Sequence, residues 1–294
     1  MEFKTLTLDC MESLKPYFKE RCCRICDYTA GMTFLWRDYH GTQYSVQDGV
    51  LYLRINKPYE AFAPPLGAES SKAAYERIIE YCAAKKRPAL ICSVSAEVLE
   101  EIREMFPRSI VCSDRAWSDY LYHANDIKDL AGRKFSGQRN HINRFKRENP
   151  DWSFERVTAD NLHEAKAFIE SLAHDNAKME SAAYAEANRK TLEALDNLEL
   201  YGAFGGVLYA NGKTVGVSVG ETAGDTLFVH VEKADTDYHG AYPMLVNQFA
   251  AMFAGDGIDY INREEDDGVE GLRVSKLSYH PAALLDKYEV ELKL

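Results

Sequence analysis

Residues 200–234 read as three consecutive β-strands, and this stretch constrains the fold more than any other part of the chain. The sequence LYGAFGGVLYANGKTVGVSVGETAGDTLFVHVEKA is interrupted at Asn211-Gly212 and at Gly224-Asp225. Both dipeptides are typical of tight β-hairpin turns. The following residues predict a helix over 241–257 that stops at a glycine, and then a strand over 258–262. A meander continued by a helix and a strand indicates an α+β layer with a mixed sheet.

The first half of the chain has a similar rhythm. A strand-like start at residues 3–8 precedes a helical stretch over residues 11–26, and residues 34–58 read as strands around a turn at Gln47-Asp48-Gly49. An amphipathic helix within residues 70–88 leads to a buried strand at 89–95. We therefore expect a tandem duplication of one α+β domain, divided into residues 1–125 and 126–294, with the probable active site in the second domain.

The charge of the chain narrows the choice of partners. The 294 residues carry a formal net charge of −11, which argues against broad, non-specific binding to nucleic acid or to an anionic membrane. One segment, residues 130–150, is strongly basic. It is either a solvated helix that docks the two halves or a helix that faces the phosphates of a nucleic acid, a nucleotide or a lipid head group. Its cations are Arg133, Lys134, Arg139, Arg144, Lys146 and Arg147.

A second polar segment, INREEDDGVEGLRVSKLSYHP, spans residues 261–281. Glu264 and Asp266 alternate just past a predicted strand, so in an extended chain they face the same side. Arg273 and Lys276 are three residues apart and are neighbours on a helix. The two carboxylates could grip an amine, act as a base, or simply pair with the two cations in a salt-bridge network.

Several common chemistries lack their motifs. The chain has no phosphate-binding G-x-x-x-x-G-K-[ST] loop, no G-x-S-x-G turn and no H-E-x-x-H pair. Cys23-x-x-Cys26 has no second cysteine pair at zinc spacing, so we expect no metal and interpret both as half-buried thiols on a helix. No apolar run approaches the ~20 residues that span a bilayer, and no signal peptide opens the chain. These patterns favour a cytoplasmic protein with reduced thiols.

Three segments resemble a known bacterial family, the proteins similar to the C-terminal domain of phosphatidylglycerol lysyltransferase, many of which are uncharacterised. The segments are FAPPLG, SDYLYHANDIKDLAGRKFSGQRNHINRF and INREEDDGVEGLRVSKLSYHP, and the resemblance covers most of the chain. It implies two domains of the acyl-CoA N-acyltransferase (GNAT) type in tandem. Characterised relatives move an aminoacyl group from a charged tRNA to a lipid head group, and related tandem proteins use peptidoglycan precursors.

The resemblance also implies a site in the second domain. The catalytic set that we predict is Glu264, Asp266, Arg273 and Lys276. The substrate-binding set is Asn262, Lys134, Arg139, Asn140, Arg144, Lys146 and Tyr279. In this hypothesis Glu264 or Asp266 deprotonates or positions the nucleophile, Arg273 and Lys276 stabilise the carbonyl oxygen or bind phosphate, and the basic segment binds the phosphates of the donor.

The identity of the donor is left open by one departure from the GNAT pattern. Acetyl-CoA users of this fold carry a glycine-rich loop whose N–H groups bind pyrophosphate before the helix that follows the meander. Here that place reads DTDYHGAYPML, with the single glycine Gly240. We predict an acyltransferase that uses aminoacyl-tRNA and a small-molecule, lipid head-group or peptide acceptor. The alternatives are an acyl-CoA-dependent N-acyltransferase with an atypical loop, and a non-catalytic module that binds an anionic nucleotide or a peptide.

Overall fold

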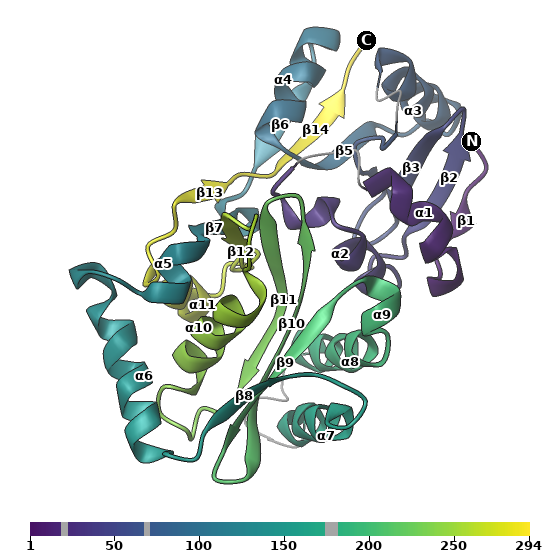
Figure 1. The fold of residues 1–294 in the computed structure, drawn as a ribbon. Helices are drawn as coiled ribbons and strands as arrows, with labels where there is room; N and C mark the ends of the chain where they lie inside the picture. The colour runs from purple at the N-terminus through teal and green to yellow at the C-terminus, as the bar shows by residue number, and fades with distance from the viewer. Residues whose placement is uncertain (19–22, 68–70, 174–181) are drawn as a thin grey trace. The chain divides into compact units, whose positions relative to one another are not determined.

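A computed structural model describes residues 1–18, 23–67, 71–173 and 182–294, and these residues form two compact units with one sheet each (Figure 1). Unit 1 comprises Met1–Asp119, Glu265–Glu270 and Leu284–Leu294, and unit 2 comprises Tyr120–Glu264 and Gly271–Ala283. Both sheets are mixed and flanked by helices, which confirms the α+β class. Among the helices of the described ranges, none is long and apolar enough to cross a membrane.

The sheet of unit 1 has seven strands. In spatial order they are β1 (Lys4–Thr5), β2 (Gln43–Gln47), β3 (Val50–Ile55), β4 (Ala61–Phe62), β5 (Ala89–Val94), β14 (Tyr288–Leu292) and β6 (Ile110–Ser113). The predicted hairpin joins β2 to β3, and Asp48 and Gly49 both adopt the positive φ that such a turn requires. Strands β4 and β5 pair in parallel through Phe62 and Ile91.

Four α-helices accompany this sheet: α1 (Met11–Phe18), α2 (Ala30–Leu35), α3 (Lys72–Ala84) and α4 (Ala96–Met105). The apolar face predicted for α3 is confirmed, because Tyr75, Ile78 and Cys82 are buried in the core of the unit. The helix expected over residues 11–26 is shorter than predicted. Helix α1 ends at Phe18, residues 19–22 lie outside the described ranges, and Cys26 opens a short 3₁₀ turn, η2 (Cys26–Tyr28).

The sheet of unit 2 also has seven strands. In spatial order they are β8 (Ser153–Arg156), β9 (Phe204–Ala210), β10 (Lys213–Ala223), β11 (Thr226–Ala234), β12 (Tyr260–Asn262), β7 (Asp119–His123) and β13 (Ala283–Leu285). Strands β9, β10 and β11 are the predicted antiparallel meander. Strand β12 then pairs with β11 in parallel.

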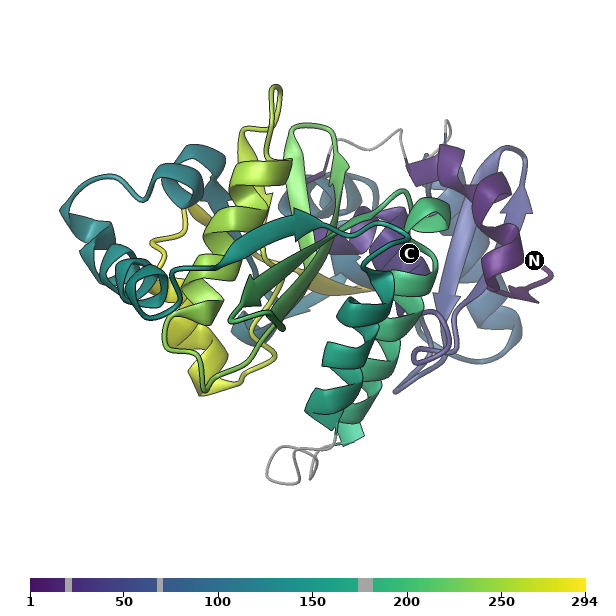
Figure 2. The ribbon, with the colours of Figure 1, turned by 60° about the horizontal axis from the view of Figure 1, so that its bottom comes forward.

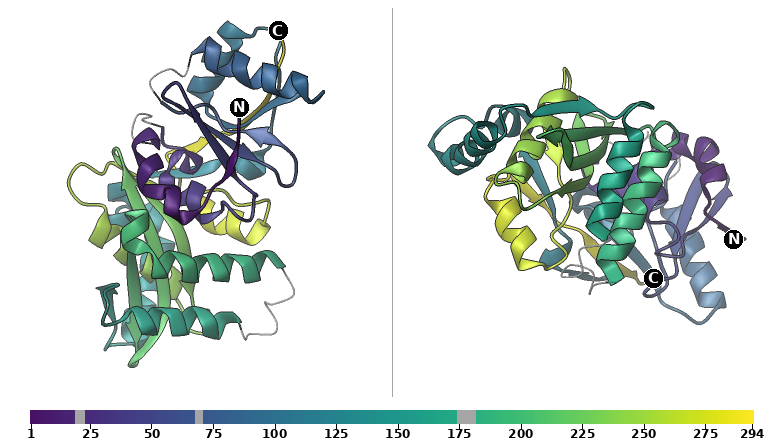
Figure 3. Two further views of the ribbon diagram at one scale, coloured as in Figure 1. Left: turned by 90° about the vertical axis from the view of Figure 1, so that its right-hand side faces the viewer. Right: turned by 90° about the horizontal axis from the view of Figure 1, so that it is seen from below.

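Seven α-helices belong to the second half of the structure: α5 (Ala124–Asp129), α6 (Ser136–Glu148), α7 (Leu162–Ala173), α8 (Ala182–Asp196), α9 (Leu198–Tyr201), α10 (Ala241–Phe253) and α11 (Glu270–Leu277). Helices α7 and α8 lie side by side on one face of the sheet, and α10 covers the other face (Figures 2 and 3). The side of α10 that carries Met244, Leu245 and Phe249 is buried in the core of unit 2.

The two sheets have the same strand order, which confirms the tandem duplication, but each contains a strand from the other half of the chain. Strand β7 follows β6 along the chain and lies between β12 and β13; strand β14 follows β13 and lies between β5 and β6. The final strand, expected in the second domain, therefore belongs to the sheet of unit 1. The sequence division after residue 125 stays a prediction, whereas the compact units are discontinuous along the chain.

Candidate active sites at the parallel strand pairs

Each sheet contains a parallel strand pair, β4–β5 in unit 1 and β11–β12 in unit 2, and polar side chains gather where each of these pairs ends. In unit 2, residues Thr226–Phe228 of β11 pair with Tyr260–Asn262 of β12, and beyond these residues the two strands diverge. Ligands of open α/β sheets commonly bind beyond the carboxyl ends of parallel strands. The carboxyl ends of β11 and β12 are therefore the expected position of a site in this unit.

Three predicted site residues meet at this divergence. The backbone N–H of Glu264 donates to Oδ1 of the buried Asn262 at 2.7 Å. The ammonium of Lys276 donates to the carbonyl oxygens of Arg263 at 2.6 Å and Glu264 at 3.3 Å. Glu264 has a φ of +58°, a conformation that non-glycine residues rarely adopt and that is found disproportionately at functional sites. Asn262 and Lys276 thus hold Glu264 in an unusual turn.

A buried histidine lies against Glu264. His230 is the extra residue of a β-bulge, because Val231 pairs with Val219 and Val229 pairs with Gly220 on β10. Bulges re-aim side chains and are common beside active sites. The Nδ1 of His230 lies 2.7 Å from Glu264 Oε1, and its Nε2 lies 3.0 Å from Glu221 Oε1. Burial opposes the charged imidazolium, but the two carboxylates outweigh it and raise the pKa of His230 to about 10.

A second ion pair lies next to this turn. Arg263 donates through Nε and Nη2 to the carboxylate of Glu232, at 3.0 and 2.6 Å, and its guanidinium lies 4.8 Å from the ring centroid of Tyr279. Burial acts to lower the pKa of Arg263, but the Glu232 carboxylate outweighs burial and raises the pKa above its usual value. Arg263 and the predicted residue Tyr279 line a cavity of about 260 Å³ with Gln138 of α6.

The basic segment forms the turn before α6 and α6 itself, and its cations have local partners. Lys134 pairs with Asp126 at 2.9 Å, and Arg139 donates to the carbonyl oxygens of Leu130 and Gly132. Arg144 pairs with Glu148 at 2.7 Å one turn along the helix, and the ammonium of Lys146 lies over the ring of Trp152. Asn140 is exposed on the same helix, and Arg273 is half-buried on α11.

Asp266 belongs to unit 1 and not to unit 2, so the structure does not group it with Glu264 in one compact unit. Its side chain is fully buried, accepts a hydrogen bond from the backbone N–H of Gly268 at 2.9 Å, and lies 3.5 Å from Arg115 Nη1. These contacts place Asp266 inside the turn that ends the acidic run, residues 264–267.

Unit 1 contains a larger cavity of about 400 Å³. It opens where β4 and β5 end: Ala63 and Pro64 line it after β4, and Cys92 and Ser93 line it from β5. Ser93 has a φ of +52° at a register shift between β5 and β14, and its hydroxyl donates to Asp27 Oδ1 at 2.6 Å. The cavity of unit 1 thus corresponds in topology to the strand divergence of unit 2.

A buried cluster of charges forms one wall of this cavity. The ammonium of Lys287 lies 2.6 Å from Asp27, 2.8 Å from Asp119 and 2.8 Å from Glu265, and 3.4 Å from Cys26 Sγ. Burial raises the pKa of Asp119 to about 7 against the opposing charge of Lys287. For Asp27 and Glu265 burial also opposes ionisation, but Lys287 outweighs it and leaves the pKa of each carboxyl below its usual value.

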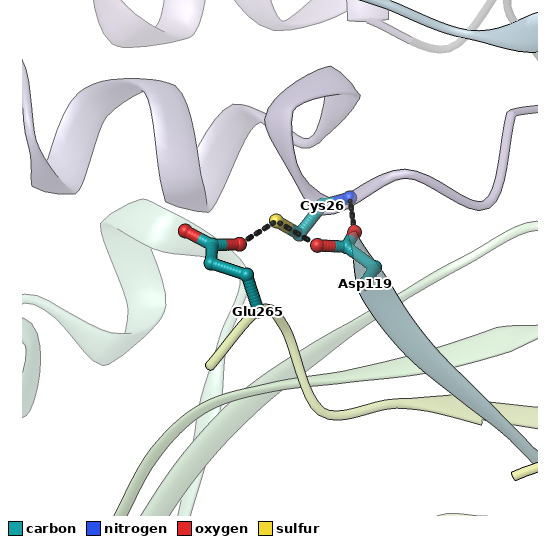
Figure 4. A group of neighbouring side chains, drawn as sticks. All are labelled: Cys26, Asp119 and Glu265. Atoms are coloured by element: carbon teal, nitrogen blue, oxygen red, sulfur yellow. Dashed lines mark hydrogen bonds between the residues drawn. The ribbon is translucent and has the colours of Figure 1, made fainter. Parts of the chain in front are cut away.

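Three members of this cluster, Cys26, Asp119 and Glu265, could in principle hold a metal ion, because their ligand atoms lie within 4.8 Å of one another (Figure 4). The ammonium of Lys287 already lies among the same atoms. Burial also raises the pKa of Cys26 well above its usual value, which keeps the sulfur a thiol and a poor metal ligand. We therefore interpret the group as a buried ion-pair cluster.

Residues 23–291 match the family model described as phosphatidylglycerol lysyltransferase, C-terminal. This chain belongs to that family. A solved protein of unknown function from Bacteroides thetaiotaomicron is 34% identical over the full length of both chains, with a TM-score of 0.93. The C-terminal domain of a putative lysylphosphatidylglycerol synthetase from Agrobacterium fabrum is 13% identical, covers 96% of this chain and 91% of its own, and has a TM-score of 0.71.

A curated relative, an uncharacterised protein of Mycoplasmoides gallisepticum, is 24% identical over 177 residues. The match spans 59% of this chain and little more than half, 56%, of that relative. The crystal structure of FemX is 9% identical, covers 100% of this chain and 98% of its own, and has a TM-score of 0.64. Together with the matching strand order of the two sheets, the similarity to these solved structures confirms the tandem GNAT-type fold.

Four residues of the two polar clusters, His230, Glu221, Asp27 and Lys287, were not among the site residues predicted from the sequence. A signal existed for His230, since FVHVE places a histidine and a glutamate at alternate positions of an otherwise apolar strand. Lys287 had no such signal: its three carboxylate partners come from segments that lie 22 to 260 residues away along the chain.

Proposed function

We propose that this protein transfers an aminoacyl group from an aminoacyl-tRNA to an amine or hydroxyl acceptor, such as a lipid head group or a peptide precursor. Membership of a family named for a lysyltransferase supports a transferase. The observation that carries the proposal is the His230–Glu264 pair at the divergence of β11 and β12. There Asn262 and Lys276 hold the backbone of the turn in which Glu264 has a positive φ, and the charged imidazole of His230 holds its partly exposed carboxylate.

The proposed chemistry needs one proton acceptor. The acceptor amine or hydroxyl attacks the ester carbonyl that joins the amino acid to the terminal ribose, and the Glu264 carboxylate takes up the proton that the nucleophile loses. The ribose oxygen leaves with a proton as the ester bond breaks, so the products are an aminoacylated acceptor and free tRNA. Because His230 stays protonated at neutral pH, its role is to hold and orient Glu264, not to act as the base.

The remaining predicted residues have supporting roles in this proposal. The exposed cations of α6 bind phosphates of the tRNA, and Arg273 of α11 stabilises the developing oxyanion. Lys276 donates to two backbone carbonyl oxygens, so we propose that it positions the turn that carries Glu264. Asp266 shapes the end of the acidic run in unit 1.

The start of α10 favours aminoacyl-tRNA over an acyl-CoA donor. Two amides of the preceding loop, those of Asp237 and Tyr238, donate to Asp235. The amide of Ala241 donates to the carbonyl oxygen of Tyr238, and Pro243 has no N–H at all. A pyrophosphate needs several unengaged amides at a helix N-terminus. The engaged amides and Pro243 reduce the number of donors at this helix start, and on this ground we propose aminoacyl-tRNA rather than coenzyme A as the donor.

The test is a comparison of donors with the purified full chain. A pool of labelled aminoacyl-tRNAs and labelled acetyl-CoA are each incubated with the protein, vesicles that contain phosphatidylglycerol, and a set of primary amines. We expect label to move from aminoacyl-tRNA to one acceptor class and none to move from acetyl-CoA. Transfer from acetyl-CoA alone would make the protein an N-acyltransferase with an atypical loop, and transfer from neither donor would contradict the proposal.

A further inference from the structure

We propose that the cavity of unit 1 binds a primary ammonium group carried on an apolar body, and that it does not accept an anionic head group. The inference extends the proposed function, since the ammonium belongs either to the aminoacyl group of the donor or to an amine acceptor. Binding to the cavity is measurable on its own, so its failure can be distinguished from a failure of transfer.

The walls of the cavity suit an apolar body next to a cation. Four aromatic residues, Tyr28, Trp36, Tyr59 and Trp117, line it together with aliphatic residues such as Leu53. Aromatic faces attract cations, and cages of this kind recognise ammonium ligands. A volume of about 400 Å³ is in the range of small-molecule sites and accommodates a side chain the size of leucine or phenylalanine.

The charges of the cavity have one predominant sign. Among the described residues that line it, Asp27, Glu265, Asp267 and Glu289 are acidic and Lys287 is the basic partner. The side chains of Asp27 and Glu265 remain 30% and 20% exposed, whereas that of Lys287 is 6% exposed beneath them. A ligand that enters the cavity therefore meets carboxylates before it meets the ammonium of Lys287.

Glu289 adds a further carboxylate to the wall of the cavity. It lies on β14 two residues from Lys287, the Cys112 thiol donates to its Oε2 at 3.8 Å, and burial raises the pKa of its carboxyl. A ligand ammonium in the cavity would favour the charged form of this carboxyl. A phosphate group would instead add negative charge beside Glu289, Asp27 and Glu265, and like charges at short range in a partly dry cavity repel strongly.

The test is calorimetric titration of the purified full chain with four small probes. These are 2-phenylethylamine, its neutral counterpart 2-phenylethanol, L-phenylalaninamide and glycerol 1-phosphate. We expect the two ammonium compounds to bind and the alcohol and the phosphate not to bind. Tighter binding of L-phenylalaninamide would assign the site to the aminoacyl group of the donor, and tighter binding of 2-phenylethylamine would assign it to an amine acceptor.

Two variants on one strand locate the binding. Glu289→Gln removes a cavity carboxylate with little change of shape and should weaken amine binding about tenfold or more, the effect typical of losing a charged hydrogen-bond partner. Glu291→Gln is the matched control, because Glu291 pairs with Lys293. Equal affinities of the two variants, equal binding of amine and alcohol, binding of glycerol 1-phosphate, or no amine binding at millimolar concentration would each overturn the inference.

Discussion

The charge of His230 depends on two glutamates from different strands. Glu221 of β10 and Glu264 beyond β12 accept hydrogen bonds from its two ring nitrogens, and together they raise its pKa to about 10 despite burial. An imidazolium in this position stabilises the folded chain and fixes the carboxylate that we propose as the base.

We predict that His230→Gln lowers the free energy of unfolding by an amount that depends on pH. The folded-state pKa of about 10 lies above the usual value of 6.5, so the stabilising contribution of His230 is complete below about pH 6.5 and is lost as the pH rises through 10. Urea unfolding should show a difference in unfolding free energy between the parent and the variant that falls by on the order of 3 kcal/mol from pH 6 to pH 10. A difference that stays constant over this range would contradict the assignment of charge.

Site residues that lie close together in the sequence, near one strand end, were predictable. Site residues that only the tertiary structure brings together were not. Asn262, Glu264 and Lys276 lie within fifteen residues of one another, and the end of β12 brings them together. Lys287 and Asp27 are 260 residues apart and meet only because β14 joins the first sheet. The basic residues of the segment 130–150 were recognised as a group, but their pairing with Asp126, Glu148 and backbone carbonyls was not.

The start of α10 depends on a glycine that packs against another helix. Gly240 has a φ of +85°, and a Cβ added there would lie 2.3 Å from the carbonyl oxygen of His141 on α6. The close contact between α6 and α10 at this point therefore requires a glycine both for its backbone conformation and for space.

Gly240→Ala should accordingly destabilise the fold by about 2 kcal/mol, from backbone strain and from displacement of α6. Gly137→Ala is the matched control on α6 itself, because an added Cβ there meets no atom within 4 Å and alanine is the better helix former. Thermal and urea unfolding of the two variants should differ in opposite directions from the parent. A neutral Gly240→Ala would show that α6 is not held against the start of α10.

Hairpins and amphipathic helices were the elements best predicted from the sequence. Asp48-Gly49 and Asn211-Gly212 determine their turns through local backbone preferences. Helix α3 was predictable from the helical spacing of its apolar residues. The length of α1 and the 3₁₀ turn at Cys26 were missed. The Cys26 backbone N–H donates to Asp119 at 2.8 Å, a tertiary contact that no local pattern indicates.

At the scale of the whole chain, each sheet is completed by a strand from the other half. Strand β14 forms ladders with both β5 and β6, and Val290 and Leu292 lie in the core of unit 1. Sequence periodicity identified the final strand but could not assign it to a sheet, because pairing over such a distance leaves no local signal.

Removal of residues 288–294 should therefore prevent cooperative folding, since β5 and β6 would each lose a neighbour and the core would lose two buried side chains. Circular dichroism should show a broad melt or none. A shorter deletion of residues 293–294 beyond the end of β14 is the control and should melt like the parent. A cooperative melt of the longer deletion at the parent temperature would contradict a structural role for the exchanged strand.

The most direct test of the account is the single-turnover rate at which label leaves aminoacyl-tRNA for an acceptor, compared between Glu264→Gln and Glu270→Gln. Glu270 is an exposed residue at the start of α11 and controls for loss of a nearby negative charge. We predict a rate at least about 100-fold below that of the parent for Glu264→Gln, with tRNA binding retained, and an unchanged rate for Glu270→Gln. Equal rates for both variants would show that transfer does not take place at the divergence of β11 and β12.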